Sequence, residues 1–169
     1  MRNLIFFVES KENPICPECG HHLKYRDSCP RHCKLEGGEK VWVQIRRMKC
    51  PHCGKLHREL PDFMVPFKHY KVEIISGVID GIVTADDEDS EDYPCMTTME
   101  RWKLWFSDNQ DNIEGYLRRI GHLLLGYGEE LLSTKDSLPG QLRERSTSWL
   151  EIIIRTIYNS GGFLESCRI

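Results

Sequence analysis

The sequence has 169 residues, of which 40% are hydrophobic and 29% are charged, and its formal net charge is −3. These values are ordinary for a soluble protein and leave room for one domain or two small ones. The longest apolar run near the N-terminus, Leu4–Val8, is too short to span a bilayer and lacks the layout of a signal peptide. We therefore expect a cytoplasmic protein with no membrane partner.

The charges are unevenly distributed along the chain. Residues 1–72 carry fourteen Lys or Arg against eight acids, and residues 73–100 carry nine acids and no Lys or Arg. Residues 101–169 carry nine of each. This asymmetry permits contact between the basic first part and a polyanion, but it does not require one.

A short apolar segment, Asn3–Val8, is rich in β-forming residues and predicts an edge strand. It leads into the first of two Cys-Pro-x-Cys-Gly motifs, at residues 16–20 and 50–54. Pro and Gly at these positions are typical of tight turns, and the repeated turn predicts the two knuckles of a zinc ribbon. In a reducing compartment such pairs indicate a metal site rather than disulfides.

Four thiolates at this spacing suit one tetrahedral Zn²⁺ ion. The predicted ligands are Cys16, Cys19, Cys50 and Cys53. A site closed by four sulfurs has no open coordination position, so we expect a structural ion rather than a catalytic one. The alternative is that the four cysteines are unrelated buried residues.

The spacer between the motifs holds Cys29 and Cys33. Together with His32, or with His21 or His22, they could form a second metal site, but free thiols are the favoured interpretation. His52 and His57 are expected to be outer-shell or surface groups, because four cysteines already complete the first shell.

Val41–Lys49 is the clearest predicted strand, with its three apolar residues at 41, 43 and 45 on one face. It follows a Gly37–Gly38 turn, and Leu56–Leu60 is its expected antiparallel partner. Several cations decorate this hairpin, namely Arg46, Arg47, Lys49, Lys55 and Arg58. They indicate either phosphate contacts or a solvated edge protected by charge.

A helix is predicted from Lys68 to about Val83, from apolar residues spaced by threes and fours. The acidic connector 84–93 follows and is expected to be a solvated loop, because it lacks the spacing of a calcium-binding loop. Thr97 and Glu100 form a capping-box pattern, which predicts that the next helix begins at Thr98.

The spacing in this second helix places Met99, Trp102 and Phe106 on one stripe, which we expect to pack against the preceding helix. Thr98, Arg101 and Trp105 lie on an adjacent face and are expected to point outward. Two helices of this kind fit a helix-turn-helix reader of DNA, and a plain helical hairpin is the alternative.

The last third of the chain is predicted to be helical. A stripe runs from Ile113 to Leu124, Ser137–Gly140 is interpreted as a turn, and Ser148 with Glu151 predicts a helix beginning at Trp149. The run Ile152–Ile154 is apolar on more than one face, so it is either deeply buried or part of a self-association surface.

Four segments together resemble a bacterial family of uncharacterised proteins that pair a zinc ribbon with a helix-turn-helix. These segments are residues 16–20, 46–54, 60–70 and 98–102. The family is similar to the N-terminal DNA-binding regions of insertion-sequence transposases. The resemblance implies that Thr98 begins a recognition helix followed by the Arg101–Trp102 pair, and it extends over residues 14–106.

The chain has too few residues after Phe106 for the catalytic domain of a transposase, and it contains no other catalytic motif. Nothing marks Cys95 or Cys167 as an activated nucleophile. We therefore expect a protein that is not an enzyme.

The predicted fold is α+β. Residues 1–66 form a four-Cys zinc ribbon with a small antiparallel sheet, 67–107 a helix-turn-helix-like unit, and 108–169 a helical tail. The first functional hypothesis is a zinc-stabilised protein that binds double-stranded DNA as a transposon accessory or regulator. Its expected DNA-contacting residues are Arg46, Arg47, Lys49, Thr98, Arg101 and Lys103.

Two other hypotheses remain open. The first is a protein-interaction adaptor, with a homodimer or a protein partner held through the C-terminal helices. The second is a ribbon that binds single-stranded RNA through Trp42 and neighbouring cations.

Overall fold

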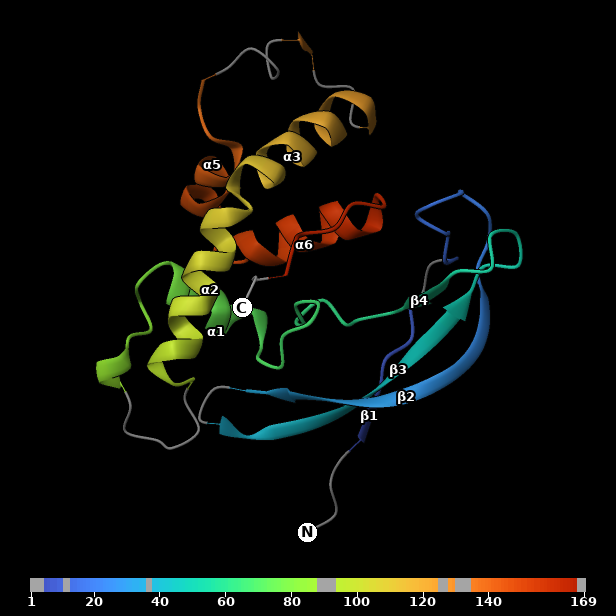
Figure 1. The fold of residues 1–169 in the computed structure, drawn as a ribbon, viewed down its shortest axis with the longest axis horizontal. Coiled ribbons are helices and arrows are strands. Elements are labelled where there is room, and N and C mark those ends of the chain that lie inside the picture. The colour runs from blue at the N-terminus through green and yellow to red at the C-terminus, as the bar shows by residue number, and fades with distance from the viewer. Residues whose placement is uncertain are drawn as a thin grey trace. The chain divides into compact units, whose positions relative to one another are not determined.

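The computed structural model describes residues 5–10, 13–35, 38–87, 94–124, 128–129 and 135–166. These residues group into two compact units, the first within Met1–Ile74 and the second comprising Ile75–Asp87 and Pro94–Ile169. The α+β prediction is confirmed, because a small sheet precedes a set of helices in the chain (Figure 1). None of the described helices is long and apolar enough to cross a membrane.

The first unit is built on a four-stranded sheet. Its strands are β1 (Ile5–Phe7), β2 (Lys24–Lys34), β3 (Lys40–Lys49) and β4 (Leu56–Arg58). β2 and β3 form the long curved hairpin seen in Figure 1, and β1 and β4 each pair with β3. The β2 and β4 pairings are antiparallel, which for β4 confirms the prediction, but β1 runs parallel to β3. Along the chain, the first knuckle and β2 come between β1 and β3. They return the chain to the end of the sheet at which β1 started, so β3 runs parallel to β1.

Strand β2 was not predicted from the sequence, which was interpreted there as an irregular spacer. Its register pairs Cys29 with Ile45 and Cys33 with Val41. The positions of β2 that lie opposite the apolar residues of β3 are therefore occupied by Cys29, Arg31 and Cys33. A strand that can be recognised from its sequence pattern would carry aliphatic residues at these positions. The predicted apolar face of β3 is confirmed, since Val43 and Ile45 are at most 1% exposed.

Helix α1 (Val72–Ile79) is shorter than the predicted helix at both ends. Tyr70 lies in extended backbone that bridges to Lys34, so it is not helical. At the other end, Gly81 adopts a φ of +74° and the Ile82 N–H donates to the Gly77 carbonyl. This left-handed cap stops the helix, and it leaves Ile82 76% exposed instead of buried.

In the second unit, α2 (Met96–Asp108) begins two residues before the predicted Thr98. Cys95 is its N-cap, with its Sγ 3.3 Å from the Thr98 hydroxyl, so Thr98 lies inside the first turn. The predicted apolar stripe is buried, but Trp105 is also only 3% exposed, which corrects its expected outward orientation. Phe106 packs edge-on against Trp149, with ring centroids 5.1 Å apart.

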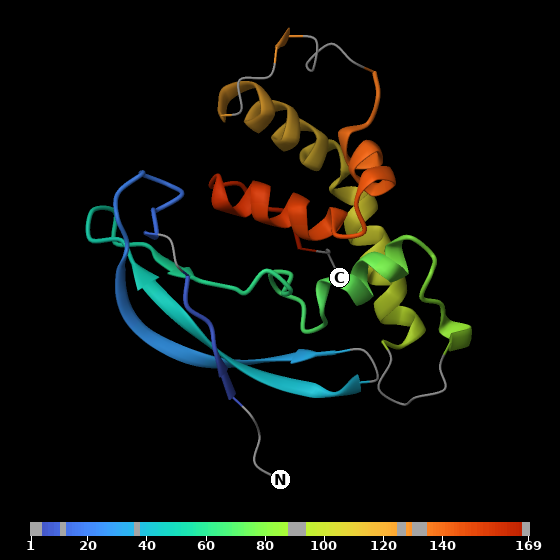
Figure 2. The same cartoon turned by 180° about the vertical axis from the view of Figure 1, so that it is seen from behind.

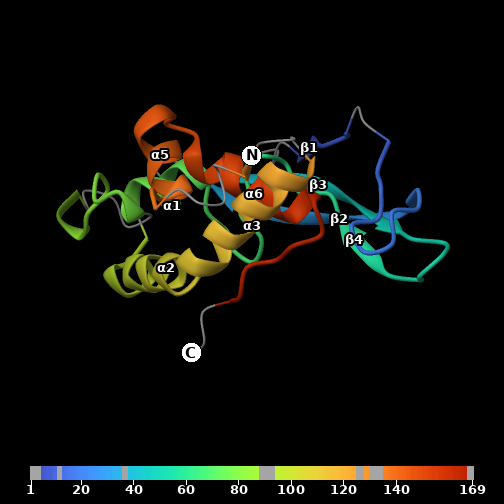
Figure 3. The same cartoon turned by 90° about the horizontal axis from the view of Figure 1, so that it is seen from above.

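The described residues of this unit form three further helices, namely α3 (Gln110–Leu124), α5 (Leu138–Arg145) and α6 (Trp149–Asn159). The predicted turn at Ser137–Gly140 is in fact the start of α5, where the Ser137 hydroxyl accepts from the Gly140 N–H. α6 begins where predicted, although the Ser148 side chain makes no capping bond. α3 lies over α6, with α5 beside both (Figures 2 and 3).

The apolar run in α6 mainly forms core. Ile153 is fully buried and Ile154 is 6% exposed, whereas Ile152 is 38% exposed. The interpretation of this run as deeply buried therefore holds for two of its three residues.

Several sequence predictions lie outside the described residues. They concern the start of the first strand, Gly37 and most of the acidic connector. Cys167 also lies outside them. Of the connector, Ala85–Asp87 forms one 3₁₀ turn.

We expect Asn109→Ala to destabilise the second unit. Asn109 joins α2 to α3 and is 1% exposed; its amide donates to the Trp105 and Glu165 carbonyls and accepts from the Glu165 N–H. Losing three buried hydrogen bonds should lower the free energy of unfolding by about 2–4 kcal/mol. Urea denaturation followed by circular dichroism measures this change. The exposed neighbour Gln110→Ala serves as the control and should change it by less than about 0.5 kcal/mol.

Candidate metal centre

The two Cys-Pro-x-Cys-Gly motifs fold into the same turn. In each, the glycine N–H donates to the carbonyl of the first cysteine, Gly20 to Cys16 and Gly54 to Cys50, both at 2.9 Å. The two glycines have φ values of +73° and +76°, a conformation that other residues adopt only with strain. The sequence motif therefore specifies the local geometry that brings each pair of thiols together.

The four cysteine sulfurs form one cluster, with every sulfur within 4.8 Å of the others. The Cys16 and Cys53 sulfurs are 3.7 Å apart, and those of Cys19 and Cys50 are 3.5 Å apart. A tetrahedral ion with metal–sulfur bonds of about 2.3 Å requires sulfurs about 3.8 Å apart. All cysteines in the described residues are free thiols. The predicted ligand set is thus brought together with the spacing that a metal ion needs.

Without a bound ion, the thiols of the cluster differ in pKa and influence one another's ionisation. The Cys53 N–H, 3.5 Å from the Cys50 sulfur, and neighbouring thiols lower the pKa of Cys50 to about 6. A backbone hydrogen bond from His21 favours the Cys19 thiolate, but burial and the neighbouring thiols outweigh it and raise the pKa of Cys19 to about 12. One thiolate therefore suppresses ionisation of the next. A bound cation removes this repulsion and stabilises all four thiolates together.

Two histidines flank the cluster. His57 Nε2 lies 3.4 Å from the Cys16 sulfur, within reach of a hydrogen bond to that sulfur. His52 is exposed and stacks on His21, with ring centroids 3.8 Å apart. Cys19, His21 and His52 also bring ligand atoms within 4.8 Å of one another, but Cys19 already belongs to the four-Cys cluster.

Cys29 and Cys33 lie on β2, away from both clusters found among the described residues. Cys33 is fully buried, and burial raises the pKa of its thiol to about 11.

A family model matches residues 16–102, just over half of the chain, and begins at the first cysteine of the cluster. The chain belongs to the DUF6431 family, a domain of unknown function. Neither a curated protein nor a solved structure matches the chain. The DUF6431 match includes both knuckles, β2 to β4, α1 and the first part of α2, so the four-Cys cluster lies wholly inside it.

Two of the three arginines predicted to contact DNA, Arg46 and Arg47, are engaged by carboxylates. Arg46 donates to both oxygens of Glu59, at 2.6 and 3.0 Å, and to Glu9 at 3.1 Å. Arg47 makes a bidentate pair with Asp27, both bonds at 2.5 Å, and it lowers the pKa of that carboxyl. These pairs hold neighbouring strands together, so contact with a phosphate would require them to exchange partners.

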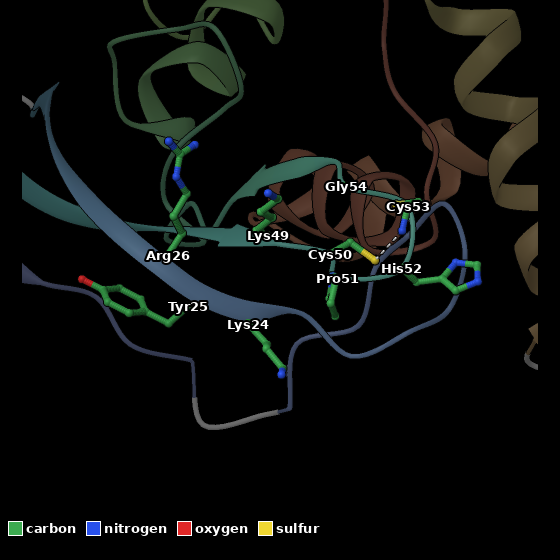
Figure 4. A pocket seen from close by; sticks show the side chains of 9 residues that line it. All are labelled: Lys24, Tyr25, Arg26, Lys49, Cys50, Pro51, His52, Cys53 and Gly54. Atoms are coloured by element: carbon green, nitrogen blue, oxygen red, sulfur yellow. Dashed lines mark hydrogen bonds between the residues drawn. The ribbon is translucent and has the colours of Figure 1, made fainter.

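Lys49 belongs instead to an open groove beside the second knuckle, with a volume of about 570 Å³. Three exposed cations line it, Lys24, Arg26 and Lys49, together with Tyr25, and no acid is among its lining residues. Figure 4 shows Arg26 and Lys49 extending to one side of the strands and Lys24 to the other. Sequence reasoning missed Lys24 and Arg26 because it missed β2.

The predicted contacts on α2 are spread around the helix. Arg101 and Lys103 are exposed, and Thr98 is half-buried. Because successive residues turn by 100° about a helix axis, Arg101 and Lys103 point in directions about 200° apart. Only one of them can face the same groove of a duplex. The connection from α1 to α2, residues 80–95, is also far longer than the usual three- or four-residue turn of a helix-turn-helix.

Proposed function

We propose that this protein is a DNA-binding protein whose first unit is held together by one structural zinc ion. The four-thiolate cluster supports zinc, because soft thiolates in a closed tetrahedral set favour Zn²⁺ over hard cations such as Mg²⁺ or Ca²⁺. A reducing cytoplasm would keep these thiols available for the metal.

The observation that carries DNA binding is the cationic groove beside the second knuckle. Lys24, Arg26 and Lys49 rim it without an acid among its lining residues, and the knuckle fixes its shape. Such a groove suits the phosphate backbone of a duplex, where affinity comes from counterion release. Lys49 is retained from the sequence prediction, and Lys24 and Arg26 are added to it.

The resemblance to transposase N-terminal regions supports duplex DNA as the polymer and a transposon accessory or regulator as the biological role. In this proposal Arg101 of α2 is the residue placed to read base edges, since it follows Thr98 on the same helical face. Arg46 and Arg47 would contribute only if their ion pairs with carboxylates exchanged partners, and Lys103 points about 200° away from Arg101 around the helix.

The test replaces the three groove cations together, as Lys24→Ala/Arg26→Ala/Lys49→Ala. Each lost phosphate contact should reduce the magnitude of the slope of log K against log salt by about 0.9. The slope of the triple variant should therefore be smaller in magnitude than that of the wild type by about 2.7. Fluorescence anisotropy with labelled duplex DNA at several salt concentrations measures it. The matched control is Arg119→Ala/Lys135→Ala/Arg145→Ala, which removes three exposed cations of the second unit.

An unchanged slope in the groove variant would refute the assignment of this surface to DNA. Selection of binding sites from random duplexes, with wild type and Arg101→Ala, then tests sequence reading: a motif enriched by the wild type alone supports it. If neither protein enriches a motif and the wild type captures a defined protein partner, the adaptor hypothesis replaces the DNA proposal.

A further inference from the structure

One face of the sheet in the first unit carries exposed aromatic side chains. The strand register places Ile5 and His32 opposite Trp42 on either side, so these three side chains leave the same face. Phe7 follows the same alternation along β1 and is 82% exposed. The ring of His69 stacks on that of His32. We refer to these five residues as the aromatic face.

The rings of this face form a ladder that ends in solvent. His32 lies edge-on to Trp42, with centroids 5.5 Å apart, and stacks on His69 at 4.4 Å with an interplanar angle of 11°. His69 is exposed. A ladder of nearly parallel rings with an exposed terminal member can be extended by another flat ring, and a nucleic-acid base is such a ring.

Cations surround the ladder. Burial lowers the pKa of His32, and the neighbouring His69, Lys40, Arg31 and Lys34 lower it further. His32 is therefore neutral near pH 7, which suits stacking, while the lysines provide charge for a polyanion. Carboxylates occur at the other end of this face, where Glu9 and Glu59 are both held by Arg46.

The turn at residues 65–68 provides an independent observation. It closes with a hydrogen bond from the Lys68 N–H to the Val65 carbonyl, and Phe67 has a φ of 64°. Among the described residues Phe67 is the only non-glycine with a positive φ. Glycine or asparagine is usual at this position of a type II turn.

The Phe67 ring gains no burial in return for this strain, because it is 74% exposed. Strained backbone that displays an exposed side chain is typical of functional positions. The turn is fixed to β2 at the edge of the aromatic face, since Arg31 donates to the Lys68 carbonyl at 3.3 Å and the Lys34 N–H donates to the His69 carbonyl.

We propose that the aromatic face, together with Phe67 at its edge, binds single-stranded DNA, with unpaired bases stacking on Phe7, Phe67 and His69. Lys34 and Lys40 contact the phosphates of the same strand. The choice of DNA over RNA rests on the proposed function, because the groove and the aromatic face then act on one polymer. A strand leaving a duplex held in the groove would supply the unpaired bases.

The test measures binding of the full, zinc-loaded chain to a labelled oligothymidylate of about 16 nucleotides, near the upper end of site sizes for single-strand binders. Phe7→Ala and Phe67→Gly should each weaken binding by about 5- to 150-fold, the range expected for one lost stacking contact. Phe67→Gly also relieves the strained φ, so the folded protein should be at least as stable as wild type. Phe7→Trp should retain affinity, and Phe163→Ala, an exposed aromatic residue of the second unit, is the matched control.

The groove variant Lys24→Ala/Arg26→Ala/Lys49→Ala separates this inference from the proposed function. It should lose duplex binding and keep its affinity for the single strand. The inference is overturned if Phe7→Ala and Phe67→Gly bind the oligonucleotide as wild type does. It is also overturned if RNA of the same length binds tenfold more tightly than DNA. A third contrary outcome is a wild-type protein that is dimeric and binds no single strand, and that becomes monomeric on Phe7→Ala substitution.

Discussion

Cys16→Ser is expected to unfold the first unit and to abolish stoichiometric metal binding. Cys16 is 1% exposed, and its sulfur lies 3.7 Å from that of Cys53. A structural four-thiolate zinc site contributes about 10–16 kcal/mol of apparent binding free energy, which is also folding free energy when the site exists only in the folded state. Removing one of four ligands should forfeit several kcal/mol of this, more than a small sheet can spare.

The reason for so large an effect is the size of the core that the metal supports. Besides the buried cysteines, the described residues of the first unit bury few large aliphatic side chains, namely Val43, Ile45, Met48, Met64, Val65, Val72 and Ile74. β4 is three residues long, and the knuckle that precedes it is closed by backbone hydrogen bonds and joined to the first knuckle by the Lys55–Glu18 ion pair. Without the ion, each thiolate would suppress the ionisation of its neighbours, and the four cysteines would not cross-link the two knuckles.

Metal content measured by mass spectrometry should be one zinc per wild-type chain and none in Cys16→Ser. Amide resonances of residues 16–58 should collapse in dispersion, whereas the helical circular dichroism of the second unit, which has its own core, should persist. Cys29→Ser is the matched control, because Cys29 is a half-buried cysteine outside the cluster. Full metal content and normal dispersion in Cys16→Ser would show that Cys16 is not a ligand.

The metal centre could be predicted from the sequence because its geometry is local. Each Cys-Pro-x-Cys-Gly motif closes its own turn, and Gly20 and Gly54 are required by a positive φ at those positions. The two turns are joined by the β2–β3 hairpin, so the pairing of these two strands is enough to bring the four sulfurs together. The same locality explains why β3 was found, since Val43 and Ile45 alternate with polar residues.

Features that depend on tertiary partners could not be predicted in this way. β2 has Cys29, Arg31 and Cys33 at its inward positions, so no apolar alternation marks it. Arg46 and Arg47 carry the same charge whether they face solvent or carboxylates, and only the strand register brings Asp27 opposite Arg47.

Trp105 and the start of α2 illustrate the limit of helical patterns. A stripe drawn through Met99, Trp102 and Phe106 leaves Trp105 outside it, yet Trp105 is 3% exposed because the helix is covered on more than one side. The capping-box pattern predicted a start at Thr98, but Cys95 occupies the N-cap, a role for which cysteine is not among the preferred residues. Sequence patterns therefore located the helix and misjudged which of its faces are covered.

Trp149→Ala is expected to produce the largest loss of stability in the second unit. Trp149 is 1% exposed at the start of α6, and its indole N–H donates to the Asp80 carboxylate at 2.9 Å. Arg143 of α5 donates to the other oxygen of Asp80 and lies 5.0 Å from the Trp149 ring centroid. The Trp149 side chain thus joins the segment after α1, which holds Asp80, to α5 and α6, and its ring also packs against Phe106.

Truncating a fully buried tryptophan costs about 3–5 kcal/mol. Trp149→Phe helps to separate the contributions, because it keeps a six-membered aromatic ring in the core and removes the hydrogen bond to a charged acceptor, which is worth about 1.5–3 kcal/mol. Urea denaturation followed by helical circular dichroism measures both, with Phe163→Ala as the exposed control expected to stay within about 0.5 kcal/mol of wild type. If Trp149→Phe lost as much stability as Trp149→Ala, the bond to Asp80 rather than ring packing would dominate. A loss below about 1 kcal/mol in Trp149→Ala would contradict the central position of this residue in the core, since a cavity of that size cannot close without moving α5 or α6.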